Sequence, residues 1–228
     1  MKKKVSLLLI VFIVLISFTG CKKNDALLFK EDYESINDKE SKSGKKHRSV
    51  TIDENNPFVI SSAKEVVEKI NNKDSFYVYF GSKICPWCRS VIEKAIEVAN
   101  NNNVTKIYYV DIWNDEGEEI LRDKYEVDDK GNVIKTIDGK EEYYELLKLL
   151  DNVLEDYTYT KDEKQESFGE KRIYAPNFIY ISNGKAIKLT TGISSLQKDS
   201  RETLTEEMLK DEEKEFNDIF VNVCDSSC

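Results

Sequence analysis

Apolar and polar positions follow two different rhythms in the middle of the chain. Two runs, FYVYF (76–80) and KIYYVDI (106–112), consist mainly of aromatic and β-branched residues, which is typical of strands buried on both faces. Between these runs, apolar side chains recur every three or four residues, which predicts an amphipathic helix. Its inward positions are Val91, Ile92, Ala95, Ile96 and Ala99.

Strands and helices are predicted to alternate along this part of the chain. PFVIS (57–61) predicts a short strand, and SAKE (62–65) carries the serine and glutamate of a capping box, which predicts the start of a helix. DEGEEILRDKYEV (115–127) predicts another helix. Because helices separate the strands, we expect an α/β fold with parallel strand pairs.

The second half of the chain departs from this alternation. Residues 128–173 contain two turn signals, an amphipathic helix over 140–154 and a polar loop. PNFIYIS (176–182) and AIKLTT (186–191) then predict an antiparallel hairpin. A last amphipathic helix is predicted from Thr203 to Val223, and TLTE is its candidate capping box.

The first residues have the pattern of an export signal. Three lysines precede an apolar stretch from Val5 to Phe18, which is shorter than the ~20 residues that span a bilayer. FTGC (18–21) resembles a bacterial lipobox, and this resemblance implies that Cys21 carries a lipid; an uncleaved short anchor is the alternative. We therefore expect residues 1–20 to be a lipoprotein signal and the protein to be anchored in a bacterial cell membrane, facing outward.

Composition then divides the rest of the chain. Residues 21–55 are rich in charged and small polar side chains and predict a flexible tether, in which His47 belongs to a solvated charge cluster. Residues 56–223 are expected to form one domain, and 224–228 a short tail. The formal net charge of −9, or −12 without the signal lysines, makes nucleic acid an unsuitable partner.

Four further cysteines form two close pairs, Cys85 with Cys88 and Cys224 with Cys228. An even number of close thiols in an exported chain favours disulfide chemistry. CPWC stands between a buried strand and a helix, where a thiolate at Cys85 faces unpaired backbone N–H groups and the positive end of the helix dipole. Cys88 lies one helical turn further on the same face.

With YAP (174–176) placed directly before a strand, the chain resembles the thioredoxin superfamily, and within it exported lipoproteins of the bacteriocin-transport-accessory group. The resemblance implies a thioredoxin-like fold, a mixed central sheet flanked by helices, in which residues 128–173 are an insertion before the cis-proline strand. It also implies a cis bond at Ala175-Pro176, facing the cysteines. Two positions differ from the usual family pattern: Tyr79 stands where a buried acid is common, and Asn177 where threonine is common.

These observations predict a thiol–disulfide oxidoreductase that needs no cofactor or metal. Cys85 attacks and Cys88 resolves, while Pro86 starts the helix without needing an N–H partner. Trp87, Ala175 and Pro176 are the expected substrate contacts. The expected partners are protein thiols or disulfides and a second redox protein that resets the pair.

Three questions stay open at this level. The CPWC pair could be static, in an accessory subunit of a peptide or bacteriocin exporter, because fold alone does not establish activity. The two cysteine pairs could instead share a metal ion. The tail CDSSC could form a local disulfide, exchange electrons with CPWC, or stay free.

Overall fold

A computed structural model describes residues 24–220 of the chain. Its centre is a five-stranded sheet in the order β1-β3-β2-β8-β9, in which β3 pairs in parallel with both β1 and β2, and the two remaining pairs are antiparallel. The strands are β1 (Phe58–Ile60), β2 (Phe76–Gly81), β3 (Ile107–Asp111), β8 (Asn177–Ser182) and β9 (Lys185–Thr190). The expected mixed α/β sheet is confirmed, and its arrangement fits a thioredoxin-like fold.

Helices cover both faces of this sheet. Alternate residues of β2 point to opposite faces, so Tyr79 joins one hydrophobic cluster and Val78 the other. Helices α4 (Pro86–Asn101) and α6 (Glu206–Phe220) pack together over the first cluster, and α3 (Ala63–Asn71) and α5 (Glu141–Leu149) over the second. Ser62 caps α3 by accepting a hydrogen bond from the backbone N–H of Glu65, as its sequence predicts.

The predicted tether is wrong for residues 24–55, which belong to the folded domain. Helix α2 (Asp25–Glu34) starts at Asn24, whose side chain accepts a hydrogen bond from the N–H of Leu27 at 2.8 Å. Phe29 and Tyr33 lie one turn apart and are buried against the sheet, in the first cluster, together with Val50 and Ile52. A few correctly spaced apolar side chains are enough to order a segment that is otherwise polar.

Hydrogen bonds from Arg89 of α4 hold several residues that precede this helix in the chain. The guanidinium of Arg89 is buried and donates hydrogen bonds to the backbone oxygens of Arg48, Tyr33 and Lys83, and to the side chain of Asn37. His47 and Arg48 are half-buried, which corrects the prediction of a solvated charge cluster.

The helix predicted over 115–127 is absent. A turn closed by Asn114 and Glu118 occupies its first part, with Gly117 at a φ of 75°. Its last residues form strand β4 (Lys124–Val127), which pairs with β5 (Val133–Ile137). The charged pattern of this segment suits a helix, but hairpin pairing and the turn glycine determine its structure.

Helix α5 therefore provides the helical crossover between β3 and the cis-proline strand. It lies within the segment predicted as an insertion; Tyr143 and Leu146 on it, and Leu150 directly after it, are fully buried. The segment predicted as a polar loop forms a second hairpin, β6 (Glu155–Lys161) with β7 (Lys164–Arg172). The added structure thus consists of two hairpins, one on each side of a core helix.

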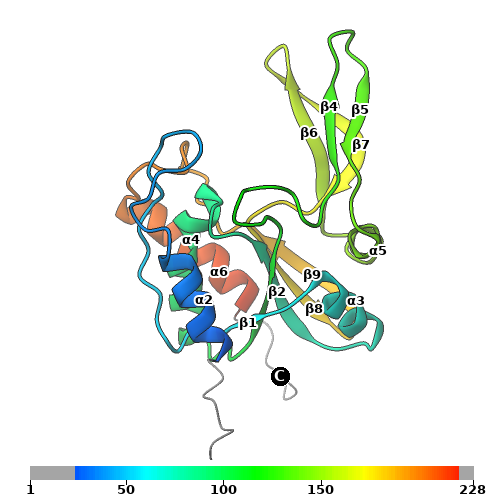
Figure 1. Cartoon of the computed structure of the whole chain (residues 1–228). Coiled ribbons are helices and arrows are strands. Elements are labelled where there is room, and N and C mark those ends of the chain that lie inside the picture. Colours follow the sequence, from blue (N-terminus) through cyan, green and yellow to red (C-terminus); the bar gives the residue numbers. More distant parts are fainter. Residues whose placement is uncertain (1–23, 221–228) are drawn as a thin grey trace, which may run out of the picture.

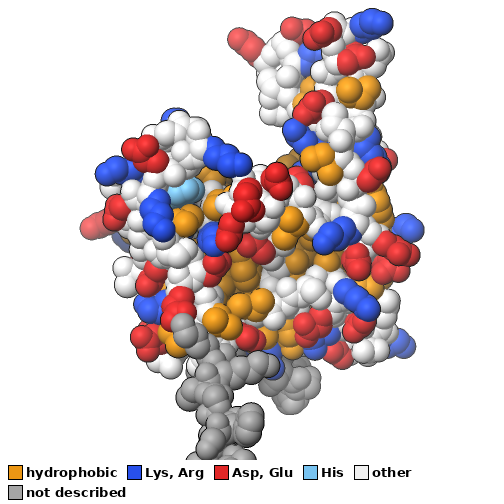
Figure 2. Space-filling view, viewed as in Figure 1, with side chains coloured by type: hydrophobic (Ala, Val, Ile, Leu, Met, Phe, Trp, Pro, Cys, Tyr) orange, Lys and Arg blue, Asp and Glu red, His pale blue; other side chains and the backbone are white. Residues whose placement is uncertain are grey.

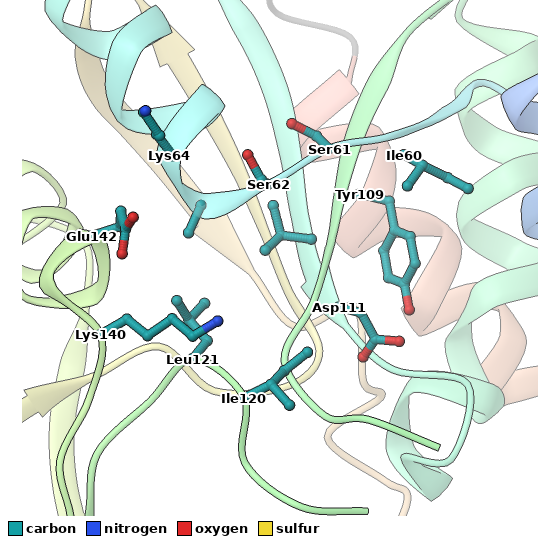
Figure 3. A pocket seen from close by; sticks show the side chains of 12 residues that line it. Ile60, Ser61, Ser62, Lys64, Tyr109, Asp111, Ile120, Leu121, Lys140 and Glu142 are labelled. Carbon is teal, nitrogen blue, oxygen red and sulfur yellow. The ribbon is translucent and has the colours of Figure 1, made fainter.

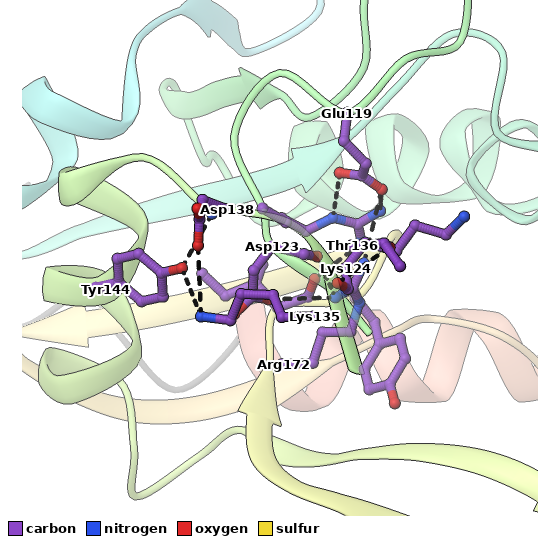
Figure 4. A network of polar contacts seen from close by, with 12 residues as sticks. Glu119, Asp123, Lys124, Lys135, Thr136, Asp138, Tyr144 and Arg172 are labelled. Carbon is purple, nitrogen blue, oxygen red and sulfur yellow. Dashed lines mark hydrogen bonds and ion pairs between the residues drawn. The ribbon is translucent and has the colours of Figure 1, made fainter. Parts of the chain in front are cut away.

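The two hairpins stand together as an arm that extends from the body (Figure 1). Rings on the two hairpins hold them to each other, since Tyr125 of β4 contacts Tyr157 of β6 and Phe168 of β7. Polar contacts fix the base of the arm (Figure 4). Arg172, at the end of β7, donates to the backbone oxygen of Asp123 at 2.8 Å.

The end of the chain follows the prediction closely. Strands β8 and β9 form the expected hairpin. Helix α6 begins at Glu206, three residues later than predicted. The side chain of Thr205, not that of Thr203 as TLTE predicted, accepts a hydrogen bond at this end, from the N–H of Met208. Residues 221–223, predicted to end this helix, lie outside the described residues. Among residues 24–220, no helix is both long enough and apolar enough to cross a membrane.

Candidate active site

The CPWC motif lies where β2 leads into α4. Cys85 is the N-cap of α4, and the backbone N–H of Cys88 donates a hydrogen bond to the Cys85 sulfur at 3.2 Å. Pro86 occupies the first turn, where a missing N–H costs nothing. Both thiols are free and buried, and Cys85 is 2% exposed.

The surroundings of Cys85 favour its thiolate. Burial alone would raise the pKa of this thiol, but hydrogen bonds from the Cys88 thiol and from the backbone N–H groups of Cys88 and Trp87 outweigh it. The positive charge of Arg122 acts in the same direction. The pKa of Cys85 is therefore lowered from its ordinary value, as expected for an attacking thiol at a helix N-terminus.

Cys88 behaves in the opposite way. Burial raises the pKa of its thiol well above the ordinary value, and the neighbouring Cys85 raises it further. Two groups oppose this, a hydrogen bond from the Tyr79 hydroxyl and one from the backbone of Ser82. The two thiols thus have separated pKa values, which suits one sulfur to attack first and the other to attack later.

The loop before β8 faces the first cysteine. The Ala175-Pro176 bond is cis, as the resemblance implied, and the thiol of Cys85 donates a hydrogen bond to the backbone oxygen of Ala175 at 3.5 Å. Asn177 is buried and its side-chain oxygen accepts a hydrogen bond from the N–H of Tyr174 at 2.7 Å. Residues ninety positions apart therefore meet at one site.

Two tryptophans and an arginine surround this site. Trp87 and Trp113 are half-buried and pack against the first hydrophobic cluster. The indole N–H of Trp113 donates to Glu119 at 2.7 Å, and the guanidinium of Arg122 lies 5.1 Å from the centre of the Trp113 ring. Arg122 also donates to the backbone oxygen of Ile173, next to the cis-proline loop, at 3.0 Å.

The chain matches no protein-family model and no curated protein. Its sheet order, the position of the cysteine pair and the loop that faces it are therefore the grounds for the thioredoxin-like description.

The predicted site residues divide into two groups. Cys85, Pro86, Trp87, Cys88, Ala175 and Pro176 come together at one end of the sheet. Cys21, Cys224 and Cys228 lie outside the described residues, as does the signal. Among residues 24–220, no group of three or more histidine, cysteine or acidic side chains could hold a metal ion.

Sequence reasoning missed three residues near the site. Tyr33 comes from the predicted tether and Arg122 from the predicted helix, so their positions depended on elements that were assigned wrongly. Lys83 forms ion pairs of 2.6 Å with Asp32 and Asp115, and these partners raise the pKa of its ammonium group despite burial. For Lys83, the available sequence signal was its position two residues before Cys85.

A pocket of about 290 Å³ opens beside the ends of β1 and β3 (Figure 3). Figure 3 shows the Tyr109 hydroxyl turned toward the carboxylate of Asp111. Burial raises the pKa of Asp111, although hydrogen bonds from the Trp113 N–H, Ser82 and Tyr109 oppose that rise.

The space-filling view shows a notch between the body and the arm (Figure 2).

Proposed function

We propose that the protein is a thiol–disulfide oxidoreductase that acts through Cys85 and Cys88. The observation that carries this proposal is the position of Cys85, whose sulfur caps α4, has a lowered pKa and faces the Ala175 carbonyl. A structural thiol buried in apolar surroundings would instead have a raised pKa.

The chemistry consists of two exchanges. The Cys85 thiolate attacks one sulfur of a substrate disulfide, and the other substrate sulfur leaves with the electron pair and takes up a proton. The sulfur of Cys88 then attacks Cys85, which releases the second substrate thiol and leaves a Cys85–Cys88 disulfide. The substrate is reduced and the protein pair oxidised; a dithiol protein resets the pair, and the reverse sequence oxidises a substrate dithiol.

Substrate contacts are proposed at Trp87, Ala175 and Pro176. The backbone of Ala175 lies beside the attacking sulfur, so an extended peptide could pair with it while its cysteine reaches Cys85. The sequence supports a location outside the cell membrane, with a lipid on Cys21. There, protein disulfides form and persist, which supplies substrates for this chemistry.

A second candidate is an accessory subunit of a peptide exporter, with a CPWC pair that does not turn over. The burial of both sulfurs favours this candidate, since an attacking sulfur must reach its substrate. Movement of Trp87 or of the Ala175 loop would have to expose Cys85 in the enzyme.

Insulin reduction by the full-length protein distinguishes the two. We expect turnover with the wild-type protein, loss of turnover in Cys85→Ser, and turnover close to wild type when Cys224→Ser and Cys228→Ser are combined. Equal rates in the wild-type protein and Cys85→Ser favour the subunit. If the rate falls when both tail cysteines are replaced by serine, the tail relays electrons.

A further inference from the structure

A pair of buried tyrosines lies behind the resolving cysteine. The hydroxyls of Tyr33 and Tyr79 are 2.9 Å apart, and neither side chain is exposed to solvent. Tyr79 comes from β2, lies in the same hydrophobic cluster as Cys88, and its hydroxyl opposes the rise in the pKa of the Cys88 thiol. Tyr33 comes from α2, in the segment that the sequence predicted to be a tether.

The Tyr33–Tyr79 hydrogen bond can run in either direction, and donation by Tyr79 to Cys88 would select one of them. A tyrosine hydroxyl has one proton to donate. If Tyr79 donates its proton to the Cys88 sulfur, its oxygen can only accept from Tyr33. The chain of donors then runs from Tyr33 through Tyr79 to Cys88, and each bond polarises the next.

Neither tyrosine can replace a carboxylate as a base. Burial raises the pKa of both hydroxyls well above the ordinary value, so both keep their protons at neutral pH. A group that stays protonated can stabilise a thiolate by donation but does not remove its proton. These two tyrosines can therefore assist resolution only by donating hydrogen bonds.

We propose that the Tyr33–Tyr79 hydroxyl pair promotes the attack of Cys88 on the mixed disulfide by donating a hydrogen bond to the Cys88 sulfur. In this proposal Tyr79 donates to the reacting sulfur, and Tyr33 is a positioning residue that acts through Tyr79. The inference rests on the proposed function. According to this proposal, helix α2 contributes Tyr33 to the function of the redox site.

The proton balance of the step closes within the exchange. Cys88 loses its proton as it becomes the nucleophile, and its sulfur forms a bond with the Cys85 sulfur. The bond between Cys85 and the substrate sulfur breaks, and that sulfur leaves with the electron pair and takes up one proton. The tyrosines keep their own protons throughout.

Tyr109 offers a matched control. Its ring stacks on Tyr79 with 5.4 Å between the ring centres, and its side chain is also buried. Its hydroxyl points toward the carboxylate of Asp111, with which it interacts. Tyr109→Phe therefore removes the same atom from the same cluster without touching the donor chain.

The test uses the reduced full-length chain with serine in place of Cys21, Cys224 and Cys228. A chromogenic aromatic disulfide, 5,5′-dithiobis(2-nitrobenzoate), releases one chromophore when Cys85 attacks and a second when Cys88 resolves the mixed disulfide. We expect Tyr79→Phe to slow the second release about tenfold or more, as loss of a charge-assisted hydrogen bond implies, and to leave the first within about twofold. The pH midpoint of the second release should rise.

Tyr33→Phe should slow the second release in the same direction by a smaller factor, and Tyr109→Phe should not change it. The inference is overturned if both Tyr33→Phe and Tyr79→Phe resolve at the wild-type rate, or if Tyr109→Phe slows resolution equally. Tyr33→Phe decides the matter if Tyr79→Phe does not fold, because it keeps the stacked ring and does not contact the sulfur. If the first release is absent in the parent protein, the proposed function itself is wrong.

Discussion

The sulfur of Cys85 lies 3.5 Å from the backbone oxygen of Ala175, although ninety residues separate them along the chain. The fold produces this contact by pairing β2 with β8 in antiparallel fashion, so that the end of one strand meets the beginning of the other. The Cys85 thiol thus lies next to the backbone of the cis-proline loop, an arrangement that suits exchange with a cysteine in an extended peptide.

Arg122 should contribute to the reactivity of Cys85. Its charge lowers the pKa of the thiol, so Arg122→Gln should raise that pKa and slow alkylation of Cys85 at neutral pH. Arg122→Lys keeps the charge and should retain most of the effect. Alkylation rates measured against pH, and read at Cys85 by peptide mass spectrometry, test this. Identical pH profiles in all three proteins would show that the arginine has no part in activating the thiol.

The N-terminal segment should contribute to stability as a core element does. Phe29→Ala should lower the free energy of unfolding by about 3–5 kcal/mol, because a fully buried ring leaves a cavity. Leu28→Ala is the matched control, since Leu28 is 37% exposed and its loss should cost less than about 1 kcal/mol. Urea unfolding measures both. If both substitutions lowered the free energy of unfolding by equally small amounts, residues 24–55 would behave as a tether and not as part of the core.

Glu212 should make the protein less stable at alkaline pH. Its carboxyl group has no hydrogen-bond partner among the described residues, and burial raises its pKa to about 7, which Arg48 and Lys94 only partly oppose. A carboxyl whose folded pKa exceeds its unfolded pKa adds stability at low pH and loses it as pH rises through the folded value. Glu212→Gln should therefore gain about 1–2 kcal/mol relative to wild type at about pH 8, and little at about pH 5.

Thermal unfolding at both pH values checks this sign. A constant difference between wild type and Glu212→Gln across the range would mean that the carboxyl does not titrate in the folded protein.

The arm should affect substrate choice more than stability. Replacing residues 157–170 by a short glycine-serine turn removes most of the β6–β7 hairpin and should preserve the fold, because these strands pair only with each other. Leu146→Ala, in contrast, removes a fully buried side chain of α5 and should cost about 2–5 kcal/mol. Rates with insulin and with small aromatic disulfides, compared before and after the deletion, show whether the arm selects substrates. If the ratio of the insulin rate to the aromatic-disulfide rate does not change, the arm takes no part in substrate selection.

The sequence predicted the centre of this fold because its signals there are strong and local. FYVYF and KIYYVDI are continuous apolar runs, and Cys85, Pro86 and Cys88 mark the start of α4. The place of Pro176 opposite the cysteines followed from the resemblance, which did not specify that β2 pairs with β8. These parts of the site could be predicted from local sequence pattern and from the order of the elements along the chain.

Other parts were not predictable from local pattern. The helix expected over 115–127 failed because Gly117 closes a turn and Lys124–Val127 pair with a strand that has a mixed polar sequence. Residues 155–172 form a hairpin whose polar strands are held by ring contacts such as that between Tyr157 and Phe168. Tyr33 was missed because its role depends on Tyr79, which lies 46 residues later.

The central claim is that Cys85 and Cys88 form a reversible redox pair, and equilibration with glutathione buffers of stepped potential tests it most directly. After acid quenching and differential alkylation, peptide mass spectrometry reads the two cysteines. We predict one two-electron transition between dithiol and disulfide, with a midpoint between about −270 and about −120 mV. A pair that stays in a single form across that whole range would contradict the account.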